Sequence, residues 1–180
     1  MVFCKTICIL YKTKSLLSRR ARAESDITEH VSDFRDKRKD GIIMTEKQQK
    51  AIELHGNGYN CFQSVACVFA PELDVDEVTA FRMGEGFGLG MGDMSQTCGA
   101  ITGAVACMGL LNSAGDLDAP NTPKRATMGL ASTLTARFLA EHGSCICQVL
   151  KGRTGCPVVP CDTCIADCVG YVEEELKNRV

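Results

Sequence analysis

Cysteine is the residue type in this chain that could do chemistry. Twelve of the 180 residues are Cys, several times ordinary usage but below the roughly 8–10% that is typical of a disulfide scaffold. In their deprotonated form such thiols bind metal ions and act as nucleophiles. Four of them fall in, or one residue from, the first turn of a predicted helix, where unpaired backbone N–H groups and the helix dipole favour anions. These four are Cys61, Cys98, Cys147 and Cys161.

Five further cysteines divide into two groups. Cys67 and Cys107 lie in the middle of predicted helices among apolar neighbours, so we expect them to fill the core. Three more are secondary candidates for a site: Cys156, Cys164 and Cys168. With Cys161 they have the spacing of plant-type ferredoxin ligands, but the sequence has no strands from which to build the ferredoxin sheet.

Helices must position these thiols, because the hydrophobic pattern after residue 44 is helical and no convincing period-2 strand is present. The predicted helices cover 45–55, 60–69, 74–83, 97–111, 127–142, 144–150 and 162–177. Thr45 with Gln48, and Asn60, supply caps at the first two starts. The predicted fold class is therefore all-α, a small helical bundle with a Gly-rich loop and a Cys-rich C-terminal loop.

Glycines mark two places where backbone could approach a site closely. The run from Gly84 to Gly92 does not match a dinucleotide-binding loop, and we interpret it as a turn that needs positive φ. Within this run, Gly90 and Gly92 could bring backbone near the thiols. Gly99 and Gly103 give the helix over 97–111 a small face for a neighbouring backbone, which could belong to this chain or to a second subunit of a homodimer.

Charge divides the chain into two parts. Residues 1–43 carry ten basic and six acidic side chains, whereas the whole chain has a net charge of −2. This balance argues against nucleic-acid binding, and the apolar stretch 7–11 is too short for a membrane span or for an export signal. We expect 1–43 to be a mobile or over-extended N-terminal segment, with Cys4 and Cys8 outside the chemistry, and 44–180 to be a single cytoplasmic domain.

Four segments carry a resemblance to a known family. They are the Gly58-Tyr59-Asn60-Cys61-x-Gln63 segment, the glycine run 86–92, Thr97-Cys98-Gly99-Ala100-x-Thr102-Gly103, and Gly143-Ser144-x-x-Cys147-x-x-Leu150-x-Gly152. Together they resemble a family of redox-active proteins that is about 140 residues long and is known for a C…CGAxxG…C…C pattern. The resemblance implies a redox role for Cys61, Cys98, Cys147 and Cys161, with Cys164, Cys168 and Cys156 as added thiols that make the fourth ligand ambiguous. Related segments also occur in split-Soret cytochromes, but covalent haem is not implied here because Cys161-x-x-Cys164 is followed by Ile165.

Three chemistries fit these residues. The first is an iron–sulfur centre for electron transfer, most simply [2Fe–2S] on Cys61, Cys98, Cys147 and Cys161. The second is a metal-free thiol–disulfide oxidoreductase or redox sensor. The third is a structural Cys4 zinc site in a binding module. Each histidine in the domain, His55 and His142, is interpreted as a surface or cap residue. No substrate or redox partner protein is named by the sequence, which leaves open whether the chain is an enzyme.

Overall fold

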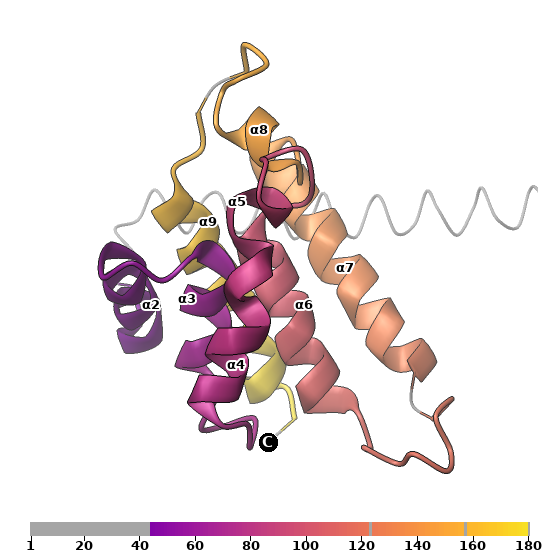
Figure 1. The fold of residues 1–180 in the computed structure, drawn as a ribbon. Helices are drawn as coiled ribbons and strands as arrows, with labels where there is room; N and C mark the ends of the chain where they lie inside the picture. The colour runs from indigo at the N-terminus through magenta and orange to yellow at the C-terminus, as the bar shows by residue number, and fades with distance from the viewer. Residues whose placement is uncertain (1–43, 123, 157, 180) are drawn as a thin grey trace, which may run out of the picture. The chain divides into compact units, whose positions relative to one another are not determined.

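The structure is a computed structural model that describes residues 44–179 except 123 and 157. The expectations for 1–43, including Cys4 and Cys8, lie outside the described residues. The helices are α2 (Glu46–Gly56), α3 (Cys61–Val68), α4 (Glu77–Gly84), α5 (Gly88–Met91), α6 (Gly99–Asn112), α7 (Lys124–His142), α8 (Cys147–Leu150) and α9 (Cys161–Lys177), with a 3-10 turn over Glu85–Phe87 (Figure 1). Among the described residues there is no strand, only an isolated bridge between Thr97 and Ile146. The all-α prediction is confirmed.

Side-chain caps fix where the first helices begin. The Thr45 hydroxyl accepts from the backbone N–H of Gln48 at 3.2 Å, and the Gln48 side chain accepts from the N–H of Thr45 at 2.9 Å. Asn60 and Gln63 form the same reciprocal box at the start of α3. These two starts are confirmed. The third start was placed too early, because Asp76 rather than Asp74 accepts from Thr79 and caps α4.

The core lies between α3, α6 and α9, with α2, α4 and α7 packed around them (Figure 1). The small face of α6 meets α3: a Cβ on Gly103 would lie 3.0 Å from the Phe62 carbonyl oxygen, and one on Gly99 would lie 2.9 Å from the Phe87 carbonyl oxygen. The close approach predicted for this face is therefore made within the chain.

Helix α7 differs from its prediction in extent. It begins at Lys124, three residues earlier than 127, and it buries Leu134 and Phe138. The next residue, Leu139, is 50% exposed. The reason is geometric: one residue beyond Phe138, a side chain is rotated by about 100° around the helix and leaves the buried stripe. Every helix of the described chain is too short or too polar to span a bilayer.

The glycine run forms a left-handed turn. Leu89, Gly90, Met91 and Gly92 all have positive φ, from 52° to 99°, and the N–H of Gly92 donates to the Gly88 carbonyl at 2.8 Å. The predicted positive-φ turn is confirmed, but two of its positions carry Leu and Met, for which this conformation costs roughly 1–2 kcal/mol each.

Candidate functional site

Cysteines stand at the starts of four helices. Cys61, Cys147 and Cys161 are the first residues of α3, α8 and α9, and Cys98 is the N-cap of α6. The helix-start placement expected from the sequence is confirmed. The first N–H groups of each helix have no partner within the helix, so these positions favour a thiolate or another anion.

Backbone contacts bring these helix starts to one end of the bundle. The N–H of Cys98 donates to the Cys145 carbonyl at 2.8 Å, and the N–H of Cys147 donates to the Gln96 carbonyl at 2.9 Å. These bonds tie the start of α6 to the start of α8. A Cβ on Gly99 would lie 3.2 Å from Cys61 Cβ, and one on Gly90 would lie 2.6 Å from Cys147 Cβ, so glycine is what lets the segments meet.

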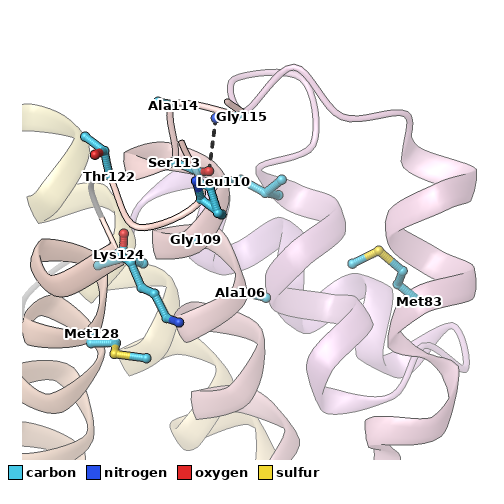
Figure 2. Close-up of a pocket in the computed structure, with 12 residues that line it drawn as sticks. Met83, Ala106, Gly109, Leu110, Ser113, Ala114, Gly115, Thr122, Lys124 and Met128 are labelled. Atoms are coloured by element: carbon cyan, nitrogen blue, oxygen red, sulfur yellow. Dashed lines mark hydrogen bonds between the residues drawn. The ribbon is translucent and has the colours of Figure 1, made fainter. Parts of the chain in front are cut away.

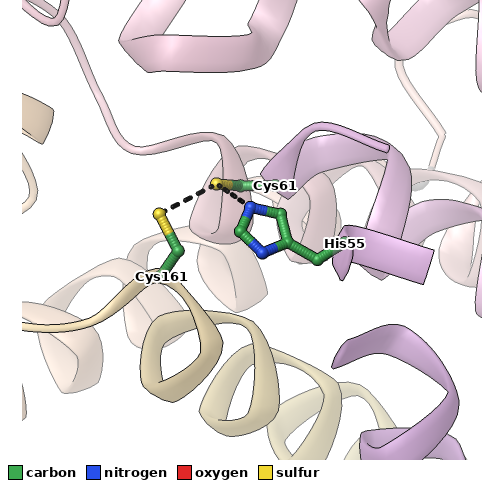
Figure 3. Close-up of side chains that lie close together, drawn as sticks. All are labelled: His55, Cys61 and Cys161. Atoms are coloured by element: carbon green, nitrogen blue, oxygen red, sulfur yellow. Dashed lines mark hydrogen bonds between the residues drawn. The ribbon is translucent and has the colours of Figure 1, made fainter. Parts of the chain in front are cut away.

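Two pairs of thiols result. The Sγ atoms of Cys61 and Cys161 lie 3.7 Å apart, as Figure 3 shows. Cys98 and Cys164 form the second pair, in which each thiol has the largest effect on the pKa of the other. Two thiolates on one tetrahedral ion, each about 2.3 Å from it, lie about 3.8 Å apart, so the separation in the first pair is that of two ligands of a single metal ion.

His55 and Asp162 extend the first pair. The imidazole Nε2 of His55 lies 3.9 Å from Cys61 Sγ (Figure 3). The Nδ1 atom of the same ring lies 3.0 Å from Asp162 Oδ1, to which it donates. Ligand atoms of His55, Cys61 and Cys161 all lie within 4.8 Å of one another. A carboxylate on one ring nitrogen with the other facing a thiol pair is the usual environment of a metal-binding histidine. The interpretation of His55 as only a surface or cap residue was therefore incomplete.

The thiols of each pair differ in acidity. A hydrogen bond from Cys61, opposed by burial but helped by a hydrogen bond from Lys151, lowers the pKa of Cys161 to about 5. A hydrogen bond from Cys164, again opposed by burial, lowers the pKa of Cys98 to about 7. The same hydrogen bonds, together with burial, raise the pKa of Cys61 and of Cys164 above the ordinary range. Each pair therefore joins a more acidic thiol to a less acidic one, and Cys161 is the most acidic of the four.

Comparison with known proteins gives one match. Residues 59–175 match the family model described as "Putative redox-active protein (C_GCAxxG_C_C)". The chain belongs to this redox-active protein family. Neither the search of curated proteins nor that of solved structures found a match.

The cysteines expected from the C_GCAxxG_C_C pattern are not all equivalent in the structure. Cys61 and Cys161 are in contact, whereas Cys98 pairs with Cys164, which the sequence analysis ranked as secondary. Cys147 is buried beside them, and its pKa is raised by burial and by the charge of Cys98. The spacing could have indicated Cys164, because residues three apart share one face of a helix.

Cysteines outside these pairs have other environments. Cys168 is fully buried, one turn beyond Cys164, and burial raises its pKa. Cys156 is exposed in the loop before α9. Cys67 and Cys107 lie inside α3 and α6 and are buried, as expected for core residues.

A groove of about 800 Å³ lies away from the thiols in this C_GCAxxG_C_C family member. Figure 2 shows it beside the second half of α6, lined by Ala106, Leu110, Met83 and Met128 among others. Lys124 is its one ionisable lining residue, and no Cys or His lines it. The groove therefore offers apolar surface and no thiol or imidazole.

Proposed function

We propose that this redox-active protein transfers electrons through a Cys-ligated iron–sulfur centre, most simply [2Fe–2S]. The observation that carries the proposal is the pairing of thiols at one end of the bundle, Cys61 with Cys161 and Cys98 with Cys164. A [2Fe–2S] centre needs two protein ligands on each of two irons, and two adjacent pairs meet that requirement. When bound, the centre supplies one-electron transfer.

The surroundings of the thiols suit a negatively charged group. Four thiolates around two ferric ions and two sulfides leave an excess of about two negative charges. The starts of α3, α6 and α9 provide backbone N–H groups, and the Lys151 ammonium donates to Cys161 and to the Val159 carbonyl at 3.1 Å. Gly90 and Gly99 keep the site free of Cβ atoms where its segments touch. Gly92 ends the left-handed turn with a positive φ. Gly103 lets α6 approach α3 closely.

The fourth ligand is either Cys164 or Cys147. The effect of Cys98 and Cys164 on each other's pKa favours Cys164, whereas the sequence pattern favours Cys147. Serine replacements decide between them. We expect Cys164→Ser to lower the iron and sulfide content and Cys147→Ser to leave both near the wild-type level, and the reverse result would restore the set Cys61, Cys98, Cys147 and Cys161.

A metal-free dithiol is the second candidate. Its support is the low pKa of Cys161, about 5, beside a second sulfur at 3.7 Å. Oxidation of the Cys161 thiolate with the Cys61 thiol would form one S–S bond, release one proton, and pass two electrons to a disulfide or another two-electron acceptor. A structural zinc site is the third candidate. Its support is that the thiols of Cys61 and Cys161 and the imidazole of His55 are close enough to bind one ion.

Anaerobic purification followed by iron, sulfide and zinc analysis tests the proposal. We expect a coloured protein with iron and sulfide in equal amounts. A colourless, metal-free protein with low-pKa thiols would support the dithiol instead, and one zinc per chain without iron would support a structural site. The ten cysteines of the described residues are all free, which suits a reducing compartment, so we propose the cytoplasm as the location of the protein. The redox partner protein is to be sought there.

A further inference from the structure

A second group of metal-binding side chains lies between the end of α7 and the middle of α9. It consists of Glu141, His142 and Asp167, whose side chains are 1%, 4% and 11% exposed. One ligand atom from each lies within 4.8 Å of the others. No thiol belongs to this group, and its residues are distinct from those of the proposed iron–sulfur site.

The imidazole of His142 faces this group without a hydrogen bond. Its Nε2 is buried and has no hydrogen-bond partner, although it lies 3.2 Å from Asp167 Oδ2. A nitrogen and an oxygen at this separation, each about 2.1 Å from a shared ion, would subtend about 100° at that ion, between the tetrahedral and octahedral angles. The two atoms are thus placed as neighbouring ligands of one metal ion.

Glu141 is held as ligating carboxylates are held. Arg137 Nε donates to its Oε1 at 3.0 Å, and the Tyr171 hydroxyl donates to its Oε2 at 2.6 Å. Arg137 is itself directed to Glu174 by a second bond of 2.6 Å. Such outer hydrogen bonds orient a metal-binding carboxylate. Burial and the charge of Glu141 raise the pKa of Tyr171, which keeps its hydroxyl a donor.

We propose that Glu141, His142 and Asp167 bind one divalent transition-metal ion. One imidazole nitrogen and two carboxylates suit Zn²⁺, Fe²⁺ or Mn²⁺, whereas Ca²⁺ and Mg²⁺ prefer oxygen ligands alone. The ion would join α7 to α9, the helix whose start carries Cys161 and Cys164. The site requires no thiolate and is independent of the proposed iron–sulfur centre.

Mn²⁺ is the probe, because this hard ion discriminates against thiolates. Equilibrium dialysis of the folded full chain should give one tightly bound Mn²⁺, and pulsed EPR should detect coupling to one imidazole nitrogen. His142→Gln should remove the nitrogen coupling, and Asp167→Asn should weaken binding at least tenfold. Glu174→Gln is the matched control, since Glu174 contacts the same Arg137 but lies outside the ligand group, and it should bind like wild type.

The wild-type chain alone can overturn the proposal. Folded protein that binds no Mn²⁺ in dialysis, or whose bound Mn²⁺ shows no nitrogen coupling, would assign His142 and Asp167 to a buried ion pair instead. If a variant does not fold, as judged by circular dichroism, the melting temperatures of the wild type and of Glu174→Gln, with and without Mn²⁺, are the second measurement. Mn²⁺ should raise the melting temperature of wild type and of Glu174→Gln, and an unchanged wild-type value would also overturn the proposal.

Discussion

Replacing Gly90 with alanine should destabilise the protein far more than the same change at a neighbouring glycine. Gly90 has a φ of 57° in the left-handed turn, and a Cβ there would lie 2.6 Å from Cys147 Cβ and 2.8 Å from the Gln96 carbonyl oxygen. Two costs therefore add at this position: an unfavourable backbone conformation and a steric overlap with backbone that also bonds to Cys147.

Two other glycines separate these costs. Gly92 has a φ of 99° but open space around its Cβ position, so Gly92→Ala should cost only the conformational part, roughly 1–2 kcal/mol. Gly86 has neither positive φ nor a close neighbour, so Gly86→Ala should be neutral or up to about 1 kcal/mol stabilising. Overlap in a packed site costs about 1–3 kcal/mol more, which gives about 2–5 kcal/mol for Gly90→Ala.

Urea unfolding followed by circular dichroism measures these differences in the free energy of unfolding. The three variants should rank Gly90→Ala least stable, then Gly92→Ala, then Gly86→Ala. Equal losses for Gly90→Ala and Gly92→Ala would show that the turn does not press against Cys147, and the account of how the helix starts meet would then be wrong. Iron content measured in the same variants should fall only for Gly90→Ala.

Three further predictions concern single side chains. In metal-free protein, labelling of Cys161 by iodoacetamide should titrate with a midpoint near pH 5, and Cys61→Ala should move the midpoint upward because the donated hydrogen bond is lost; an unmoved midpoint in mass-spectrometric labelling would contradict this. Cys98→Ser should abolish the bound centre measured by iron and sulfide analysis, whereas Cys67→Ser, in the core away from the site, should change only the melting temperature. Asn60→Ala should lower the free energy of unfolding by about 1–2 kcal/mol in urea, because the side chain caps α3 and also donates to the Gly84 carbonyl at 3.0 Å; a loss below about 0.3 kcal/mol would argue against the cap.

Local signals in the sequence were enough to place the starts of α2 and α3. Thr45 and Asn60 each cap a helix through hydrogen bonds to a residue three positions later. A short stretch of sequence therefore contains the whole interaction. Because Cys61 follows such a cap, its place in a first turn could be predicted without knowing the fold. Asp74 and Asp76 show the limit of this reasoning, since both are capping residue types and only the backbone decides which one caps.

The composition of the site depended on contacts that no local pattern contains. His55 reaches Cys61 across the turn after α2, and its partner Asp162 is 107 residues away on α9. The pairing of Cys98 with Cys164 likewise depends on how α6 packs against α9. The spacing of Cys161 and Cys164 predicts that they share one face of a helix. Their partners, Cys61 and Cys98, belong to other helices, and only the tertiary structure brings them to this face.

The backbone bonds that join the starts of α6 and α8 have a consequence for how the protein would take up the proposed iron–sulfur centre. They run between main-chain atoms of Gln96, Cys98, Cys145 and Cys147, and none of them uses a sulfur atom. In zinc fingers the ligands themselves hold the fold, so chelation unfolds the chain. Here backbone bonds hold the helix starts together without the metal. We therefore expect a chelator to remove iron from the proposed site while the helical circular dichroism stays unchanged, so that the metal can bind and leave reversibly in the folded protein.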